Sequence, residues 1–302
     1  MKTAVFDYSR AESLDEVLAI LSDAGGQARI IAGGQSLVAM MAMRLARPET
    51  LIDINHVEAL SGIGKAGALV TIRACTRQAV AEKSAVIAAD VPLLAAALPY
   101  VGHIQTRNRG TIGGSLAHGD PTAEIFLTAM ALRAEVVLAS TGGTRILQIA
   151  NFGLGPMQTA AEDDECLTEI RFPIPPRCLS IGTVVDEISP KAGDYAIVGV
   201  AVEVGLDDDG ICRHLRLAAS GASPVPVSAN PVEIALLGSK LGSADVAGAA
   251  RLLDPLLDPE NDVQASAAYR RRVAAGMLVQ AIELARDRAL DRSQNQRQGD
   301  LT

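Results

Sequence analysis

The 302-residue sequence contains no tryptophan, and aromatic residues make up only 3% of it. Hydrophobic residues still account for 49%, so alanine, leucine, valine and isoleucine must fill the cores. No apolar run approaches the ~18 residues that a membrane span needs. The first apolar cluster, Met1-Lys2-Thr3-Ala4-Val5-Phe6-Asp7, carries charge, which argues against a secretory signal. These absences predict a globular, cytoplasmic chain that is long enough for two or three domains.

Cysteine is also scarce. The four cysteines, Cys75, Cys166, Cys178 and Cys212, are widely separated, and no Cys-x-x-Cys motif is present. This spacing predicts reduced thiols and no metal site, so any iron–sulfur cluster would have to lie in another chain. The net charge of −8, with acidic and basic residues interspersed, argues against nucleic-acid binding, which normally requires a basic face.

Glycine, by contrast, is concentrated in two stretches. Ala32-Gly33-Gly34-Gln35-Ser36-Leu37 follows the apolar pair Ile30-Ile31, and Thr111-Ile112-Gly113-Gly114-Ser115 follows Gly110. Glycine lets a ligand approach the main chain because it has no Cβ. Consecutive N–H groups in such a turn can converge on a phosphate. The two stretches therefore suggest a diphosphate that is bound from two sides.

Neither stretch is a Rossmann fingerprint or a phosphate-binding loop for nucleoside triphosphates, because the third glycine and the Lys-Ser/Thr ending are missing. A glycine pair after a short strand is also common in ordinary turns, so the pattern alone leaves both interpretations open. Nucleophilic catalysis is disfavoured, since neither Ser36 nor Ser115 lies in a Gly-x-Ser-x-Gly elbow.

The periodicity of the rest of the chain predicts a mixture of helices and strands. A capping box at Ser13-Leu14-Asp15-Glu16 begins a helix that ends at Gly25-Gly26. Further helices are predicted at residues 76–89, 91–101, 121–132, 243–253 and 266–292. Strands are predicted at residues 29–32, 51–54, 69–73, 135–139 and 167–172, and a hairpin at 195–204 and 211–219. The proline-rich segment at residues 173–176 is the clearest linker.

The two glycine stretches, the second extended by Arg107-Asn108-Arg109-Gly110, resemble the flavin-binding loops of the FAD-binding medium subunit of molybdenum hydroxylases. That family includes carbon monoxide dehydrogenase and xanthine dehydrogenase. The segments at residues 167–173, 191–198 and 262–271 match in the same order, so the resemblance covers nearly the whole chain. Two departures are Ser115, where many relatives have asparagine, and Asp186, where the xanthine dehydrogenase branch has lysine.

The resemblance implies an α+β fold with three parts. A two-part FAD-binding domain of the PCMH (vanillyl-alcohol-oxidase-like) type would occupy residues 1–175, divided into subdomains 1–56 and 57–175. A C-terminal α+β domain with an antiparallel sheet, like the C-terminal domain of the carbon monoxide dehydrogenase flavoprotein, would occupy residues 177–290. Residues 293–302 are expected to form a disordered tail.

The resemblance further implies a role in a complex. The chain would be the medium subunit of a heterotrimer, with a small subunit that carries two [2Fe–2S] clusters and a large subunit that carries molybdopterin. Two such heterotrimers would form a dimer. Electrons would pass from the clusters through FAD to an external acceptor. A stand-alone FAD-dependent oxidoreductase of the same fold and a non-enzymatic nucleotide-binding module remain alternatives.

Carried over to this sequence, the family's binding residues predict one site for non-covalent FAD. Residues 30–37 and 111–115 would hold the pyrophosphate, Glu124 the ribose, Leu167 the adenine or ring system, and Asp194 with Tyr195 the isoalloxazine. No residue is assigned as catalytic, because the flavin carries the redox chemistry, and Tyr195 is a candidate gate. A covalent link would involve His103 or His118. The full set is Ile30, Ile31, Ala32, Gly33, Gly34, Gln35, Ser36, Leu37, Thr111, Ile112, Gly113, Gly114, Ser115, Glu124, Leu167, Asp194 and Tyr195.

The glycines also allow an expectation about mutants. A valine at Gly34 or Gly113 is expected to displace the ligand without unfolding the chain, because its side chain would project toward the ligand.

Overall fold

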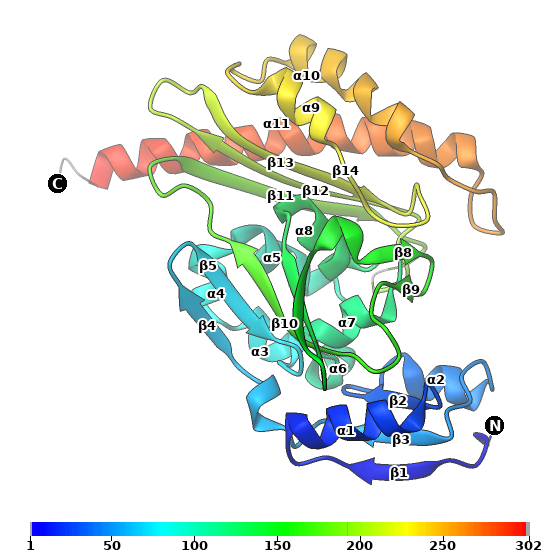
Figure 1. Ribbon diagram of the computed structural model, residues 1–302. Coiled ribbons are helices and arrows are strands. Elements are labelled where there is room, and N and C mark those ends of the chain that lie inside the picture. Colours follow the sequence, from blue (N-terminus) through cyan, green and yellow to red (C-terminus); the bar gives the residue numbers. More distant parts are fainter. Residues whose placement is uncertain (1, 192, 300–302) are drawn as a thin grey trace.

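The computed structural model describes residues 2–191 and 193–299, and it confirms the expected α+β architecture. Three tiers are stacked along the molecule (Figure 1). The N-terminal tier lies at the bottom of the view, the second part of the FAD-binding fold lies in the middle, and the C-terminal sheet with its long helix lies at the top.

The N-terminal tier is a small parallel sheet in the order β1-β3-β2. The side chain of Ser13 caps its first helix by accepting a hydrogen bond from the N–H of Glu16, and Gly25 ends that helix in the left-handed conformation. Val17, Leu18 and Leu21 form the buried face of the helix, as its periodicity predicts. The elements are β1 (Asp7–Arg10), α1 (Leu14–Ala24), β2 (Ala28–Ile31), α2 (Leu37–Ala42) and β3 (Thr50–Asp53).

The middle tier is an antiparallel sheet in the order β4-β5-β10-β6-β7, with short helices packed around it. Its strands are β4 (Ile63–Ala66), β5 (Leu69–Arg73), β6 (Glu135–Ser140), β7 (Gly143–Gln148) and β10 (Cys166–Pro173), with a small ribbon of β8 (Gly153–Gly155) and β9 (Gln158–Thr159). Its helices are α3 (Gln78–Glu82), α4 (Ala85–Asp90), α5 (Pro92–Ala97), α6 (Ile104–Arg109), α7 (Ile112–His118) and α8 (Glu124–Leu132). Short 3-10 turns are η1 (Glu58–Leu60), η2 (Leu98–Tyr100) and η3 (Ile149–Asn151).

Two predicted helices of this tier are shorter than expected. The helix predicted at residues 76–89 is divided into α3 and α4, because the hydroxyl of Ser84 accepts the N–H of Ile87 and begins a new helix. The helix predicted at residues 91–101 stays α-helical only to Ala97 and continues as η2, which contains Pro99. Proline has no N–H for the helical hydrogen bond, which accounts for this change.

The C-terminal tier is an antiparallel sheet of β11 (Ser180–Ile188), β12 (Val198–Leu206), β13 (Cys212–Ser220) and β14 (Val227–Ser228). The predicted hairpin is confirmed as β12 and β13. The long helix α11 (Ala267–Gly299) crosses the face of the sheet that is turned away from the middle tier, beside α9 (Asn230–Leu236), α10 (Ser243–Ala249) and η4 (Ala250–Leu256) (Figure 1). A Cβ at Gly182 of β11 would lie 1.9 Å from the carbonyl oxygen of Ala285, so glycine allows this helix to pack closely on the sheet.

The end of α11 differs from the expected tail. The helix continues through residues 293–299, where the sequence predicted disorder, and residues 300–302 lie outside the described part of the chain. Two arginines of this helix bind the edge strand β11: Arg288 donates to the carbonyl oxygen of Thr183 at 2.7 Å, and Arg292 donates to that of Ile181 at 2.7 Å. No helix in the described ranges is both long enough and apolar enough to cross a membrane.

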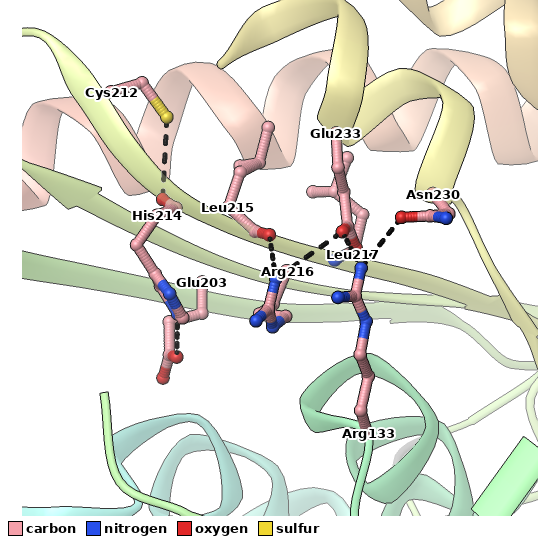
Figure 2. A network of polar contacts seen from close by, with 9 residues as sticks. All are labelled: Arg133, Glu203, Cys212, His214, Leu215, Arg216, Leu217, Asn230 and Glu233. Atoms are coloured by element: carbon pink, nitrogen blue, oxygen red, sulfur yellow. Dashed lines mark hydrogen bonds and ion pairs between the residues drawn. The ribbon is translucent and has the colours of Figure 1, made fainter. Parts of the chain in front are cut away.

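The middle and C-terminal tiers share a continuous interface. Val185, Ala201 and Ala218 of the C-terminal sheet belong to the same hydrophobic core as Phe126 of α8. At the end of α8, Arg133 has a left-handed backbone (φ 56°) and pairs with Glu233 of α9, whose exposed fraction is 1% (Figure 2). The apolar core and this ion pair hold the two tiers together.

Candidate cofactor site

A cleft of about 630 Å³ opens where the three tiers meet. Its walls come from the turn after β2, the first turn of α7, the beginning of α8, the first residues of β10 and the loop between β11 and β12. Every residue of the predicted FAD site lines this cleft except Ile112, which is completely buried in the core beneath it. The fold therefore brings together segments that are up to 165 positions apart, from Ile30 to Tyr195.

The first glycine stretch presents its main chain to the cleft. Gly34 has a left-handed backbone (φ 71°), which directs the chain from β2 into α2. Within the described residues, no acceptor takes the N–H of Gly33, Gly34, Gln35 or Ser36. Unpaired N–H groups around a left-handed glycine form the kind of concavity that binds an anion. This stretch therefore offers unpaired donors on the wall of the cleft, where the sequence places one side of a diphosphate site.

The second glycine stretch is built differently from the prediction. It is the first turn of α7, and its N–H groups already have acceptors. The N–H of Ile112 donates to the carbonyl oxygen of Thr76 at 3.0 Å, and that of Gly113 donates to the carbonyl oxygen of Ala74 at 2.9 Å. The N–H of Gly114 donates to the Thr111 hydroxyl at 3.1 Å. The expectation of freely converging N–H groups is therefore wrong here. The exposed Gly114 and the half-buried Ser115 are what this turn presents to the cleft.

Two glycines are required because parts of the protein approach each other closely. A Cβ at Gly113 would lie 2.4 Å from the Cβ of Ala74, so valine at Gly113 would force α7 away from the segment after β5. The reason expected for this variant is therefore wrong, because the added side chain would meet Ala74 and not the ligand. A Cβ at Gly33 would lie 2.4 Å from the carbonyl oxygen of Arg109. The two glycine stretches thus touch at this point.

Glu124 is the first residue of α8 and forms part of the cleft wall. Burial raises the pKa of its carboxyl to about 7, the nearby carboxylates of Glu187 and Asp120 add to the increase, and Arg107 opposes it. Burial, with a contribution from Asp186, likewise raises the pKa of Glu187 to about 7. Near neutral pH the carboxyl of Glu124 exists in both forms, so it can either accept from or donate to a ligand hydroxyl.

The remaining predicted residues, Leu167, Asp194 and Tyr195, also line the cleft. Leu167 is 7% exposed and lies beside Cys166, whose pKa is raised to about 12 by burial, so this thiol stays protonated. Tyr195 lies in the loop before β12, not at the start of the strand as predicted, and is 60% exposed. Its N–H donates to the carboxylate of Asp194 at 3.0 Å. Tyr195 is therefore a largely exposed aromatic side chain on the cleft wall and not part of a core.

The structure adds lining residues that the prediction missed. Asp120 is only 8% exposed and accepts both the N–H and the hydroxyl of Thr122 at 2.8 Å, so it shapes the turn between α7 and α8. Its signal in the sequence is the segment His118-Gly119-Asp120-Pro121-Thr122 directly after the glycines. His118 also lines the cleft, whereas the ring of His103 lies against Gly193 of the β11–β12 loop. Among the residues the structure describes, no three metal-binding side chains gather into a candidate metal site.

Comparison with known proteins assigns both halves of this fold. Residues 4–175 match the FAD binding domain in molybdopterin dehydrogenase, and residues 184–285 match the CO dehydrogenase flavoprotein C-terminal domain. Subunit alpha of the 6-hydroxypseudooxynicotine dehydrogenase complex of Paenarthrobacter nicotinovorans is 38% identical, with 96% of this chain and 97% of that protein covered. The carbon monoxide dehydrogenase medium chain of Hydrogenophaga pseudoflava is 34% identical, with 93% and 96% covered.

Solved structures agree with these relatives. The structure of Cu,Mo-CO dehydrogenase in its cyanide-inactivated form matches with a TM-score of 0.92 at 33% identity, covering 95% of this chain and all of that chain. Quinoline 2-oxidoreductase from Pseudomonas putida 86 matches with a TM-score of 0.89 at 33% identity, covering 96% and 99%. The chain therefore belongs to the family of FAD-binding medium subunits of molybdenum hydroxylases, and it is an oxidoreductase component of that family.

Proposed function

We propose that this chain binds FAD non-covalently in the cleft between its three tiers and serves as the electron-output subunit of a heterotrimeric molybdenum hydroxylase. A small subunit with two [2Fe–2S] clusters would supply the electrons, and a large molybdopterin subunit would hydroxylate the organic substrate. Two heterotrimers would associate as a dimer. The observation that best supports FAD binding is the run of unpaired N–H groups at residues 33–36 on the wall of a cleft of about 630 Å³.

The residues of the cleft would divide the binding between them. The N–H groups of residues 33–36 would bind the diphosphate, and the hydroxyl of Ser115 would add a donor from the facing turn. Glu124 would hydrogen-bond a ribose hydroxyl, and Leu167 would supply an apolar wall. When bound, the flavin supplies the redox chemistry. Tyr195 would cover its ring and limit access to it.

The cysteines of this chain are not arranged to bind an iron–sulfur cluster, which supports the proposal that a partner subunit carries the clusters. The structure buries Cys75 and Cys166 in one apolar cluster and Cys212 in another, and it leaves Cys178 exposed. None of these positions offers the four thiolates that an iron–sulfur cluster requires. Electrons would therefore enter from clusters in a partner.

The cofactor assignment is tested by purifying the full chain and precipitating it with acid. We expect a yellow protein that releases intact FAD into the supernatant, because all the contacts proposed for the cofactor are non-covalent. Flavin that remains in the pellet would indicate a covalent link, and His118 would be the residue to test because it lines the cleft. A colourless chain that also fails to bind added FAD would overturn the proposal.

The role in a complex is tested by co-expression with the chains encoded beside it. Co-purification with a cysteine-rich subunit, and flavin reduction that requires that subunit, are the expected results. Turnover of a small organic donor by the isolated chain would instead support a stand-alone oxidoreductase of the same fold.

A further inference from the structure

A chain of polar contacts crosses from the N-terminal tier to the middle tier just behind the cleft. Its central residue is Asn55, in the turn after β3, which is half-buried. The amide nitrogen of Asn55 donates to the carbonyl oxygen of Ala32 at 2.8 Å and to the Asp53 carboxylate at 2.5 Å. Its amide oxygen accepts from the guanidinium of Arg77 at 2.6 Å. Ala32 begins the first glycine stretch, so Asn55 holds one side of the predicted diphosphate site.

Arg77 holds the other side. It precedes α3, and its second guanidinium nitrogen donates to the carbonyl oxygen of Arg109, the residue before Gly110 and the second glycine stretch. The main chain around Arg77 pairs with the same segment, since Gln78 donates to the carbonyl of Gly110 at 2.9 Å. One arginine fork therefore connects the second glycine stretch to Asn55, and through Asn55 to the first.

The orientation of the Asn55 amide is fixed by its partners. Turning the amide over would place its nitrogen against the guanidinium of Arg77, and its oxygen against the carbonyl of Ala32 and the carboxylate of Asp53. Asp53 is itself held, because it accepts the hydroxyl of Tyr8 at 2.6 Å and the N–H of Asn55 at 2.9 Å. All hydrogen-bonding atoms of the amide are thus used.

We propose that Asn55 and Arg77 form a positioning clasp that sets the spacing of the two glycine stretches and thereby determines the affinity for a dinucleotide. Neither residue lines the cleft, so both would act through the backbone carbonyls of Ala32 and Arg109 and not by touching the cofactor. The inference rests on the FAD site proposed above. It adds that the site is pre-organised by residues which belong to different tiers.

The need for a clasp follows from how the two stretches meet. Gly33 packs against the carbonyl oxygen of Arg109 so closely that no Cβ would fit, and a small shift of one tier would change the space for a ligand between the stretches. A diphosphate that contacts both stretches is sensitive to this spacing. A ligand with a single phosphate can satisfy one stretch alone. The clasp should therefore matter for FAD much more than for FMN.

The test compares FAD and FMN binding to the flavin-free full chain by fluorescence titration. Arg77→Lys keeps the positive charge but cannot donate to Asn55 and Arg109 together in the planar fork of an arginine. Arg77→Gln removes the charge, and Asn55→Ala removes the centre of the clasp. For Arg77→Lys and Asn55→Ala we expect the Kd for FAD to rise ~10- to 100-fold and the Kd for FMN to rise less than ~threefold.

A double variant and two controls sharpen the result. Asn55→Ala combined with Arg77→Lys should bind FAD within ~threefold of the weaker single variant, because both changes break the same connection. Arg73→Lys is the control for the arginine, since Arg73 forms an ion pair with Glu169 at 2.9 Å and neither residue lines the cleft. Asn151→Ala is the control for the asparagine, because Asn151 is exposed. Both controls should bind FAD as the wild type does.

Three results would overturn the clasp. In one, folded Arg77→Lys binds FAD with wild-type affinity while Arg77→Gln does not, which would show that only the charge matters. In another, both flavins weaken equally in every clasp variant, which would indicate a general loss of structure. In the third, all variants bind FAD like the wild type. If Asn55→Ala does not fold, Arg77→Lys alone decides. Failure of the wild-type chain to bind FAD would overturn the proposed site together with the clasp.

Discussion

Replacing Glu124 by glutamine should make the folded chain less sensitive to pH. Burial raises the pKa of this carboxyl from its ordinary value of 4.5 to about 7. At about 1.36 kcal/mol for each pH unit between these values, ionising Glu124 costs the folded state about 3 kcal/mol relative to the unfolded chain. Glutamine has nearly the same shape and cannot ionise, so the variant should avoid this cost.

The direction of the effect follows from which state holds the proton. Below pH 4.5 Glu124 is protonated in both states, and its full contribution to stability is present. As the pH rises from 4.5 to about 7, the unfolded chain loses the proton while the folded chain keeps it, so the free energy of unfolding decreases. Above about pH 7 the loss is complete. Between pH 5 and pH 8 the wild type should lose about 2.5 kcal/mol through this group.

The assay is urea denaturation of the flavin-free chain at pH 5, 6, 7 and 8. Glu124→Gln should remove most of the decrease seen in the wild type. Glu187→Gln should remove part of it, because Glu187 also has a raised pKa and its charge raises that of Glu124. The exposed Glu260→Gln is the control and should follow the wild type. Parallel curves for wild type and Glu124→Gln would refute the assigned burial of this carboxyl.

Three further predictions use the same chain. Gly34→Ala should lower the free energy of unfolding by ~1 kcal/mol, because alanine is strained at a φ of 71°. It should also raise the Kd for FAD measured by fluorescence titration, and an unchanged Kd would contradict a role for this turn. Arg133→Ala should lower the free energy of unfolding by ~2 kcal/mol in urea, since it leaves the buried Glu233 without its main cation; the exposed Arg251→Ala should have no such effect. Tyr195→Ala should retain FAD but change the rate at which external acceptors reoxidise the reduced flavin, which stopped-flow absorbance measures. An unchanged rate together with a lower Tm would show that Tyr195 only packs against its neighbours.

The sequence predicted those parts of the fold whose signals are local and repeated. The β12–β13 hairpin combines an apolar, β-branched run with an alternating one around a turn at residues 207–210, where Asp207 accepts the N–H groups of Asp209 and Ile211. The strand β11 was not predicted, because it follows a proline-rich linker without a turn signal of its own. The helix α9 was also missed, since it is short and has Pro231 in its first turn.

The residues of the candidate site were predicted from the family resemblance. The contacts between tiers that hold these residues in place were not predicted. The glycines, Glu124 and Tyr195 belong to motifs that can be recognised in one dimension. Asn55 and Arg77 are single polar residues without a pattern around them, and only the fold shows that they contact each other and both glycine stretches. The engaged N–H groups of Ile112 and Gly113 could not be foreseen either, because their acceptors lie in the segment after β5, whereas Gly114 is bound locally by the Thr111 hydroxyl.

The arginines that bind β11 determine how the C-terminal sheet can meet other chains. A free edge strand offers carbonyl and N–H groups to any extended peptide, and this is a common route to β-sheet dimers and to aggregation. In this protein Arg288 and Arg292 occupy the carbonyls of Thr183 and Ile181, two alternate positions of the edge. An incoming strand would have to displace both guanidinium groups. Partners are therefore directed to side-chain surfaces, and shortening α11 before residue 288 would expose an edge that promotes self-association.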